Sequence, residues 1–520
     1  MLLGVDVRAD EAAFAHAFAA VTTDRVASRI QAHDTTLWGP AAAAEAEKRL
    51  GWTNLDEEST QFVPDLLALR DDVRARGLDH VVLCGMGGSS LAPEVICRAA
   101  GVELTVLDSS QPDMVRGVLS DRLDRTVVVV SSKSGTTVET DSQRRVFEAA
   151  FADAGIDPAE RLVIVTDPGS ALAEAGHAAG YRVFLADPDV GGRYSALSAF
   201  GLVPSALAGA DVEALLAQAH AVDDAVWADD GPAASLGALL GAAHEQGVDK
   251  LVLVDHTGAR LGDWIEQLIA ESTGKQGRGI LPVVVASADS PNVDPPTPDS
   301  VVVHLGDHPL HHRWSATIRA DLGAQMLLWE AITAIAGRLI GINPFDQPDV
   351  ESAKAAAREL LDGEDDLPPA DSVDGSIELF GSTAGSVRRA LEDLWSQIDP
   401  QTGYLAVQAY LDRHALAGLE RVRDTLARRT GRPVTFGWGP RFLHSTGQYH
   451  KGGAPDGVFL QITCEPLEDL AIPGRPFTFG QFCASQADGD AQVLRAKGRP
   501  VLRLHLRSPD DLTRVRELLA

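Results

Sequence analysis

At 520 residues the chain is too long for one simple core, so we expect two to four domains. Hydrophobic residues make up 45% of the chain and charged residues 23%, as is ordinary for a soluble globular protein. Its 74 acidic and 45 basic residues give a net charge of −29, which disfavours nucleic acids and anionic membranes as partners.

The cysteines and the N-terminus favour a reducing compartment. No Cys-x-x-Cys pair occurs among the four cysteines, so neither a disulfide framework nor a zinc site is indicated. The N-terminus carries early acidic residues without an apolar segment of signal length, and no apolar run is long enough to span a membrane. We therefore expect a soluble, cytoplasmic protein.

The first half of the chain predicts a helical segment followed by an α/β domain. Residues 1–60 are rich in alanine and predict a helical N-terminal segment. Residues 61–225 alternate short β-branched runs with amphipathic helices, and the predicted strands are 81–84, 126–130, 162–166 and 183–185. Since these strands are almost uninterrupted apolar runs, they favour a parallel sheet covered on both faces.

Two further α/β segments follow. Residues 226–362 predict strands at 251–254, 281–286 and 301–304, with helices at 261–270 and 318–339. The acidic, proline-containing stretch 362–374 indicates a domain boundary. Residues 376–520 predict a C-terminal α/β module with strands at 404–409, 434–437, 459–463 and 501–505.

A glycine-rich turn follows the strand at 81–84. Its sequence, Gly85-Met86-Gly87-Gly88-Ser89-Ser90, allows a tight turn and brings backbone amides and a helix N-terminus toward a ligand. A dinucleotide fingerprint requires a third glycine where Ser90 stands, so a nicotinamide cofactor is disfavoured. A tight strand–helix turn without any ligand is the structural alternative.

The loop at 131–137, Ser-Ser-Lys-Ser-Gly-Thr-Thr, lies between a strand and a helix. Its hydroxyls, its lysine and the helix-start amides are the donors that a phosphate monoester needs. The lysine precedes the glycine, so the loop is not a P-loop, which argues against a nucleotide and magnesium. A polar helix cap without a ligand is the alternative interpretation.

Three later segments extend the pattern: Gly-Gly-Arg-Tyr-Ser at 191–195, Glu-Ser-Thr-Gly-Lys at 271–275, and Phe-Asp-Gln-Pro-Asp-Val-Glu at 345–351 followed by Lys354. With the two loops they resemble, in order, the motifs of the glucose-6-phosphate isomerase (phosphoglucose isomerase) family of sugar-isomerase (SIS) domains. The isomerase part of transaldolase–isomerase fusions is the most similar variety. The resemblance implies two three-layer αβα SIS domains with parallel, flavodoxin-like sheets, beside the helical N-terminal segment and the C-terminal α/β module.

The resemblance also implies a role for each matching residue. Glu271 is the base that moves a proton between C2 and C1 through a cis-enediol, Arg193 faces the developing oxyanion, and Lys354 helps to open the sugar ring. Phosphate and substrate contacts fall on Gly88, Ser89, Ser132, Lys133, Ser134, Thr136, Thr137 and Gln347. This assignment agrees with the chemistry, because removing a proton beside a carbonyl needs a carboxylate base and a fixed positive charge.

The chain departs from the family at the ring-opening histidine. The family carries it between the glutamate and lysine motifs, where this chain offers only His304, His308, His311 and His312 in another context. A similar stretch, Phe-Leu-His-Ser-Thr-Gly-Gln-Tyr-His-Lys-Gly-Gly, occurs at 442–453 in the C-terminal module. We select His450 first and His444 second for this role, since ring opening needs a group that exchanges a proton near neutral pH. Two ordinary loop histidines are the alternative.

The resulting hypothesis is a cofactor-free and metal-free isomerase of glucose 6-phosphate and fructose 6-phosphate. Mannose 6-phosphate or the sulfonated sugar sulfoquinovose are alternative substrates, and a non-catalytic sugar-phosphate sensor or a nicotinamide dehydrogenase are alternative classes. In the family the histidine comes from the neighbouring subunit of a dimer. If this chain supplies it from its own C-terminal module, a monomer suffices; otherwise a homodimer is expected.

Overall fold

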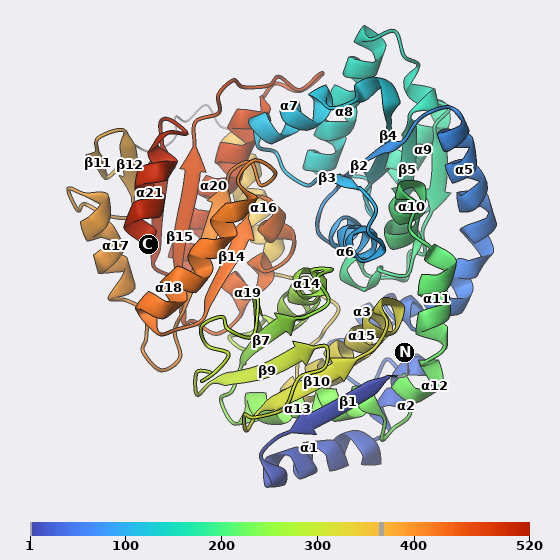
Figure 1. The fold of residues 1–520 in the computed structure, drawn as a ribbon, viewed down its shortest axis with the longest axis vertical. Coiled ribbons are helices and arrows are strands. Elements are labelled where there is room, and N and C mark those ends of the chain that lie inside the picture. Colours follow the sequence, from blue (N-terminus) through green and yellow to red (C-terminus); the bar gives the residue numbers. More distant parts are fainter. Residues whose placement is uncertain (1–2, 363–368) are drawn as a thin grey trace.

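A computed structural model describes residues 3–362 and 369–520, except for the side chains of residues 353, 354 and 362. Three sheets, each with its own helices, make up the molecule, and the C-terminal sheet stands beside the other two (Figure 1). All three contain parallel strands covered by helices, which confirms the predicted α/β class.

The first sheet has the strand order β3 (Thr105–Leu107), β2 (His80–Gly85), β4 (Thr126–Ser131), β5 (Leu162–Thr166) and β6 (Arg182–Leu185), all parallel. One face packs against α5 (Val63–Ala75), α6 (Leu91–Ala100) and α10 (Ala199–Ala208), the other against α7 (Pro112–Ser120), α8 (Val138–Asp153) and α9 (Ala171–Ala178). This is the flavodoxin-like arrangement. Alternate valines of β2 and β4 enter the two cores, which explains why these strands are apolar throughout.

The register of this sheet positions the two loops. Gly85 pairs with Ser131, so the glycine-rich turn and the loop at 131–137 leave adjacent strands at the same level. The strand order reverses between β2 and β4, and ligands of open α/β sheets bind at such a point, at the carboxyl ends of the strands.

The second sheet has the order β1 (Gly4–Arg8), β10 (Ser315–Arg319), β9 (Ser300–Leu305), β7 (Lys250–Asp255) and β8 (Leu281–Val285). β1 is antiparallel to β10, so the expected helical segment also contributes an edge strand. The predicted helix at 318–339 begins later, as α15 (Leu322–Ile340), because Ile318 pairs in the ladder between β9 and β1. In both places tertiary pairing overrides the local pattern.

Helices α13 (Pro232–Glu245), α14 (Leu261–Thr273) and α15 accompany this sheet. α15 is buried along almost its whole length in the core that the first two sheets share. Among the described residues no helix, α15 included, has the length and apolarity to traverse a bilayer.

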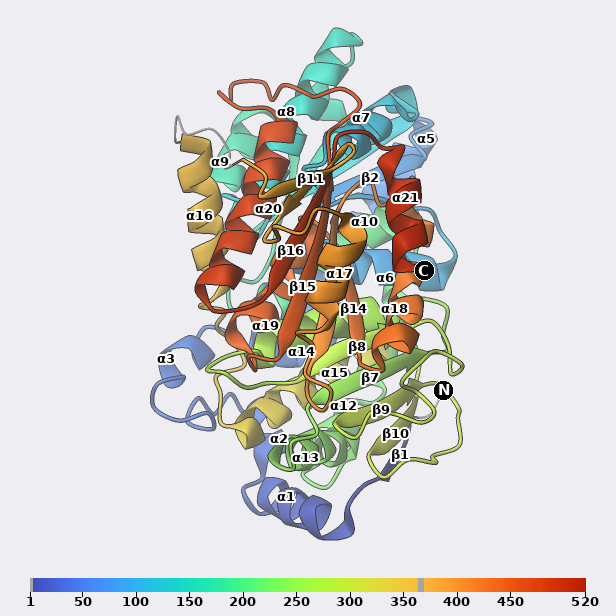
Figure 2. The ribbon, with the colours of Figure 1, turned by 90° about the vertical axis from the view of Figure 1, so that its left-hand side faces the viewer.

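The C-terminal sheet has the order β11 (Ser372–Asp374), β12 (Ile377–Phe380), β16 (Val501–Leu506), β15 (Gly457–Cys464), β13 (Tyr404–Tyr410) and β14 (Val434–Trp438). The last four are parallel and match the predicted strands, whereas β11 and β12 form an antiparallel edge that was not predicted. Helices α17 (Val387–Trp395), α18 (Val422–Thr430) and α21 (Asp511–Leu519) cover one face, and α20 (Phe479–Ala496) covers the other (Figure 2).

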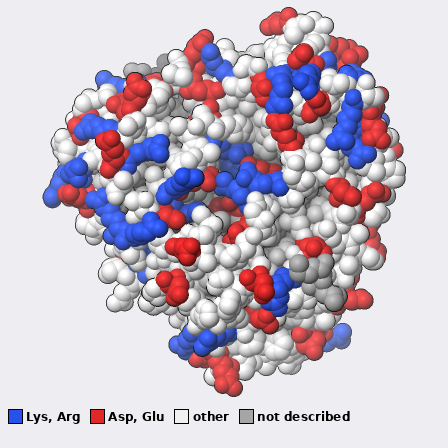
Figure 3. Space-filling view, in the orientation of Figure 1, with Lys and Arg blue, Asp and Glu red and all other residues white. Residues whose placement is uncertain are grey.

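The remaining helices surround these layers: α1 (Glu11–Thr23), α2 (Val26–Gln31), α3 (Ala43–Ala46), α4 (Leu55–Glu58), α11 (Val212–His220), α12 (Asp223–Val226), α16 (Val350–Asp362) and α19 (Gly447–Gly452). On the face in Figure 3, lysine and arginine side chains gather around the hollow near the middle of the view. This local concentration of positive charge contrasts with the net charge of −29.

Candidate active site

The loop at 131–137 ends where α8 begins, and its hydroxyls form a compact set. The hydroxyl of Ser132 donates to Oγ1 of Thr137 at 3.0 Å, and the hydroxyls of Ser134 and Thr136 lie 2.8 Å apart. Gly135 has φ of +69°, a conformation that a side chain would strain. The loop therefore presents hydroxyls and a helix N-terminus together, as an anion site requires.

Lys133 is the cation of this loop, and it is already ion-paired. Its Nζ lies 2.6 Å from Oδ2 of Asp167 and donates to the carbonyl of Pro188 at 3.1 Å. Burial raises the pKa of Asp167, although Lys133 opposes the effect. Because the ammonium charge is balanced in this way, a bound anion depends chiefly on hydroxyls and amides.

The glycine-rich turn packs directly against the segment that carries Arg193. A Cβ atom on Gly88 would lie 2.0 Å from the carbonyl oxygen of Gly192, so only glycine fits there. Ser89 follows on the same turn of 3-10 helix, residues 87–89. The close approach places the amides of this turn beside Arg193 and explains the need for glycine.

Arg193 is buried, with 4% of its side chain exposed, and several groups fix its orientation. It donates to Oγ of Ser272 at 2.7 Å, to Oε1 of Gln347 at 2.9 Å and to the carbonyl of Pro344 at 2.7 Å. Its Nη1 lies 3.4 Å from Oε1 of Glu271. The guanidinium is therefore held rigidly beside the carboxylate.

Glu271 lies near the end of α14 and has a second partner. Nε2 of Gln267 donates to Oε2 of Glu271 at 3.0 Å and to the backbone carbonyl of His444 at 2.8 Å. Gln267, which the sequence did not single out, thus joins the carboxylate to the C-terminal module. It lies one helical turn before Glu271, on the same face of the helix.

His444 reaches this cluster from the C-terminal module. Its Nε2 lies 2.8 Å from Oε1 of Glu139, in the first turn of α8, and that oxygen also accepts from Gln486 at 2.7 Å. Since a carboxylate only accepts hydrogen bonds, Nε2 carries the proton and Nδ1 is left as a base. Glu139 was missed as a functional residue, although a glutamate two positions after the anion loop was a usable signal.

His450, our first choice from the sequence, lies elsewhere. Its ring is buried among aromatic side chains, and its Nδ1 lies 3.0 Å from the hydroxyl of Tyr404. Burial, assisted by Lys451 and Arg499, lowers the pKa of His450 to about 3. A histidine that stays neutral near pH 7 is a poor proton carrier, so the structure favours His444 over His450.

Two lysines remain from the predicted motifs, and one of them holds the segment that carries Gln347. Lys275 is buried and binds the backbone carbonyl and the carboxylate of Asp346, the latter at 2.7 Å, which holds the segment that presents Gln347. Burial, with Arg193 nearby, lowers the pKa of Lys275 to about 8. Lys354 lies in α16, but its side chain is outside the described residues.

Part of this chain matches a known protein family, and several known proteins are similar to it. Residues 72–280 match the family described as phosphoglucose isomerase. A probable glucose-6-phosphate isomerase from Natronomonas pharaonis is 32% identical over 397 residues, covering 66% of this chain and 90% of that protein. The chain belongs to the phosphoglucose isomerase family.

One further sequence relative and two solved structures are also similar to this chain. The glucose-6-phosphate isomerase of Symbiobacterium thermophilum is 30% identical over 419 residues, covering 65% of this chain and 90% of its own. The structure of a glucose-6-phosphate isomerase from Chlamydia trachomatis superposes with a TM-score of 0.56 at 20% identity, covering 69% of this chain and 88% of that one. The structure of a hypothetical protein from Thermus thermophilus superposes with a TM-score of 0.59 at 24% identity, covering 69% of this chain and 100% of that one. Because these two solved structures are less than 25% identical to this chain, they support its fold alone.

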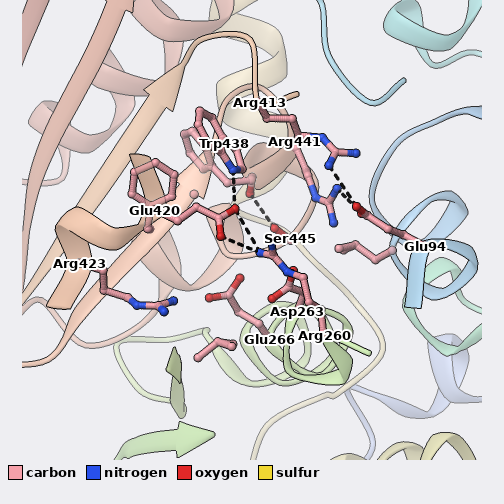
Figure 4. A pocket seen from close by; sticks show the side chains of 15 residues that line it. Glu94, Arg260, Asp263, Glu266, Arg413, Glu420, Arg423, Trp438, Arg441 and Ser445 are labelled. Carbon is pink, nitrogen blue, oxygen red and sulfur yellow. Dashed lines mark hydrogen bonds and ion pairs between the residues drawn. The ribbon is translucent and has the colours of Figure 1, made fainter. Parts of the chain in front are cut away.

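In this family member a largely, but not fully, buried ionic cluster fastens the C-terminal module to the first sheet (Figure 4). Arg441 lies 2.6 Å from both Glu94 and Asp108, and Arg413 lies 3.1 Å and 2.9 Å from the same two carboxylates. Burial alone would raise the pKa of Glu94, but Arg413 and Arg441 outweigh it and lower that pKa. Because His444 follows Arg441 closely in the chain, this cluster fixes the backbone that carries the histidine.

The cavity beside this cluster also holds Glu266 of α14. Figure 4 shows its carboxyl pointing into the space lined by Arg423, Arg260 and Glu420. Burial, with the nearby charge of Asp263, raises the pKa of Glu266 to about 8 from an ordinary 4.5. In the described part of the chain, no cluster of three histidine, cysteine or acidic residues suited to a metal ion occurs here or elsewhere.

Glu266→Gln is expected to stabilise the protein by an amount that grows as the pH rises from about 5 to about 8. Between pH 4.5 and about 8 the folded chain keeps a proton on Glu266 that the unfolded chain has lost. The free energy of unfolding of the parent therefore decreases as the pH rises through that range. We expect the variant to be more stable by ~1–3 kcal/mol at pH 8.5 and nearly unchanged at pH 5, measured by urea unfolding. An equal difference at both pH values would contradict this titration.

Proposed function

We propose that the chain interconverts glucose 6-phosphate and fructose 6-phosphate through ring opening and a cis-enediol intermediate. The observation that carries this proposal is the pair formed by Glu271 and Arg193, 3.4 Å apart. A carboxylate base beside a fixed cation is what proton transfer next to a carbonyl requires. Its relatives named glucose-6-phosphate isomerase support the same reaction.

In the proposed first step, His444 moves a proton between the ring oxygen and the hydroxyl at C1. Glu139 accepts a hydrogen bond from Nε2–H, which orients the ring and stabilises the imidazolium when it forms. The family function of Lys354 in this step stays a prediction. His444 replaces His450 as our candidate because it contacts the glutamate of the anion-loop helix.

In the second step, Glu271 removes the proton from C2 and returns it to C1. Gln267 and Arg193 bind its two carboxylate oxygens, so the base has a fixed position before substrate arrives. Arg193 also stabilises the oxyanion of the enediolate. Its hydrogen bonds to Ser272 and Pro344 already hold the guanidinium in place, so it needs little rearrangement as the charge develops.

The anion loop holds the far end of the sugar. Ser132, Ser134, Thr136 and Thr137 supply hydroxyls there, with Gly88 and Ser89 beside the sugar chain. Because Lys133 is paired with Asp167 at 2.6 Å, the loop also suits a monoanionic sulfonate. This pairing keeps a sulfonated hexose as the second candidate substrate.

A coupled assay on the purified chain tests the function. Fructose 6-phosphate is supplied, and the glucose 6-phosphate formed is followed through NADP reduction by an added dehydrogenase. Mannose 6-phosphate, the sulfonated sugar and unphosphorylated fructose are run in parallel, and their conversion is followed by NMR because the dehydrogenase detects only glucose 6-phosphate. Turnover of fructose 6-phosphate above the other three supports the proposal. Faster turnover of the sulfonate would move the assignment to that substrate, and no turnover of any would favour a binding protein.

We further propose that one chain completes the site, since His444 and Glu139 belong to the same chain. Mixing Glu271→Gln chains with His444→Asn chains, after denaturation and refolding together, should restore no activity. Restored activity would mean that histidine and glutamate are exchanged between subunits. Refolded parent chain, carried through the same cycle, is the control.

A further inference from the structure

Helix α20 of the C-terminal module begins against the core of the first sheet. Its first residue, Phe479, and Ile472 of the preceding loop pack in the hydrophobic cluster between that sheet and α8. A capping box fixes the start of the helix, since the side chains of Thr478 and Gln481 each accept from the other's backbone amide. The helix therefore has a defined position relative to α8, which carries Glu139.

Gln486 lies two turns into α20 and contacts Glu139 directly. Its Nε2 donates to Oε1 of Glu139 at 2.7 Å, and Nε2 of His444 lies 2.8 Å from the same oxygen. Gln486 and Glu139 are both buried. The C-terminal module thus supplies the histidine and also a second hydrogen bond to the carboxylate that the histidine contacts.

The other end of the Gln486 amide is bound as well. The hydroxyl of Ser110 donates to its Oε1 at 2.6 Å. If the amide were turned over, its oxygen would face the carboxylate of Glu139 at 2.7 Å, and both of these atoms only accept hydrogen bonds. The two contacts therefore fix the amide with its nitrogen toward the carboxylate.

The segment that carries Ser110 is itself attached to α8. The backbone carbonyl of Ser109 accepts from Nε2 of Gln143 at 2.9 Å, and Gln143 lies one helical turn after Glu139. Ser109, Ser110 and Gln143 are all buried. The hydrogen bonds form a circuit from α8 through the loop after β3 to α20 and back to α8. A buried network of this kind holds its members in one arrangement.

The ionisable groups beside Gln486 are neutral or already paired. One turn earlier in α20, burial raises the pKa of the Cys483 thiol to about 12, so this group is uncharged. One turn later, Asp490 belongs to a buried ion pair. At the start of the loop after β3, Asp108 is bound by the arginines of the ionic cluster. The charge that the Gln486 amide faces is accordingly that of Glu139.

We infer that Gln486 is a positioning residue for ring opening, which keeps the carboxylate of Glu139 ionised and directed at the ring of His444. The inference rests on the proposed function. Hydrogen bonds to a carboxylate favour its charged form, and two donors on one oxygen restrict its rotation. Gln486 acts through Glu139 and not on the sugar itself.

Assays of Gln486→Glu and Gln486→Met at about pH 5.5 and about pH 9 test the inference, with the coupling dehydrogenase in excess. The carboxyl group introduced by Gln486→Glu donates while it is protonated, as the amide does, but it repels Glu139 once ionised. We expect its kcat within about threefold of the parent value at the acidic pH and about tenfold or more below it at the alkaline pH. Gln486→Met should lose about tenfold at both, with KM within about twofold.

The matched control is Gln461→Met. Gln461 is another buried glutamine of the same module that donates to a carboxylate of α20, that of Asp490 at 3.1 Å. It should keep the parental kcat. Parental kcat in Gln486→Met, equal losses in the two methionine variants, or the same deficit of Gln486→Glu at both pH values would each overturn the inference. If urea unfolding shows that Gln486→Met does not fold, the pH dependence of Gln486→Glu decides.

The proton NMR resonance of Nε2–H of His444 separates this inference from the proposed reaction. It is identified by its loss in His444→Asn. We expect it to shift in Gln486→Met and to stay in place in Gln461→Met, because the oxygen that accepts this proton loses its second donor only in the former. A parent chain that converts no hexose phosphate would refute the reaction, whereas an unmoved resonance would refute the positioning by Gln486.

Discussion

Glu271→Gln is expected to lower kcat by about 10²–10⁴-fold while KM stays within about threefold of the parent value. Glutamine keeps the shape of the side chain and an amide oxygen near Arg193. It cannot accept a proton from carbon. The measurement is the coupled assay from fructose 6-phosphate, with thermal unfolding to confirm that the variant folds.

The matched control is Glu266→Gln, on the same helix but facing the charged cavity. It should retain the parental kcat, because its carboxyl contacts none of the residues assigned to the site. A Glu271→Gln chain with near-parental kcat would show that another group removes the proton. Equal losses in both variants would point to a general disturbance of α14.

His444→Asn should lower kcat by about 10²-fold or more, whereas His450→Asn should keep kcat within about threefold. Asparagine at 444 can still bind Glu139 but cannot carry a proton at neutral pH. At 450 the expected loss is one of stability, ~1–3 kcal/mol, because the hydroxyl of buried Tyr404 loses its partner. Both variants are measured in the coupled assay and by urea unfolding.

Removal of the glutamate partner provides a second test of this assignment. Glu139→Gln should lower kcat less than His444→Asn and alter its pH profile, since the glutamate orients the ring without itself transferring the proton. If His450→Asn proves the more damaging histidine variant at equal stability, the ring-opening group must be reassigned. A parental pH profile in Glu139→Gln would remove the glutamate from the mechanism.

Much of the fold could be predicted because the parallel strands are short apolar runs that end at polar loops. Gly85 and Ser131 end neighbouring strands, which brings the two predicted loops to the same edge of the sheet. The strands β1, β3, β10, β11 and β12 were missed, and each is only three to five residues long. β1 and β12 also pair with strands far away in the chain, β10 and β16.

The site was predictable to the extent that its residues lie in contiguous motifs. Choosing between His444 and His450 required burial and ion pairing, and these depend on how the C-terminal module docks. Gln267 was not foreseen, because its contacts join α14 to a backbone carbonyl of a distant segment. Such long-range contacts leave no trace in local composition.

The contact between His444 and Glu139 lies within one polypeptide. In the proposed single-chain site, the fold sets the local concentration of the histidine, whatever the total protein concentration. Specific activity should stay constant on dilution to nanomolar levels, where a shared site would come apart. A damaged copy would also leave intact copies untouched, so a mixed population would lose activity only in proportion to its defective fraction.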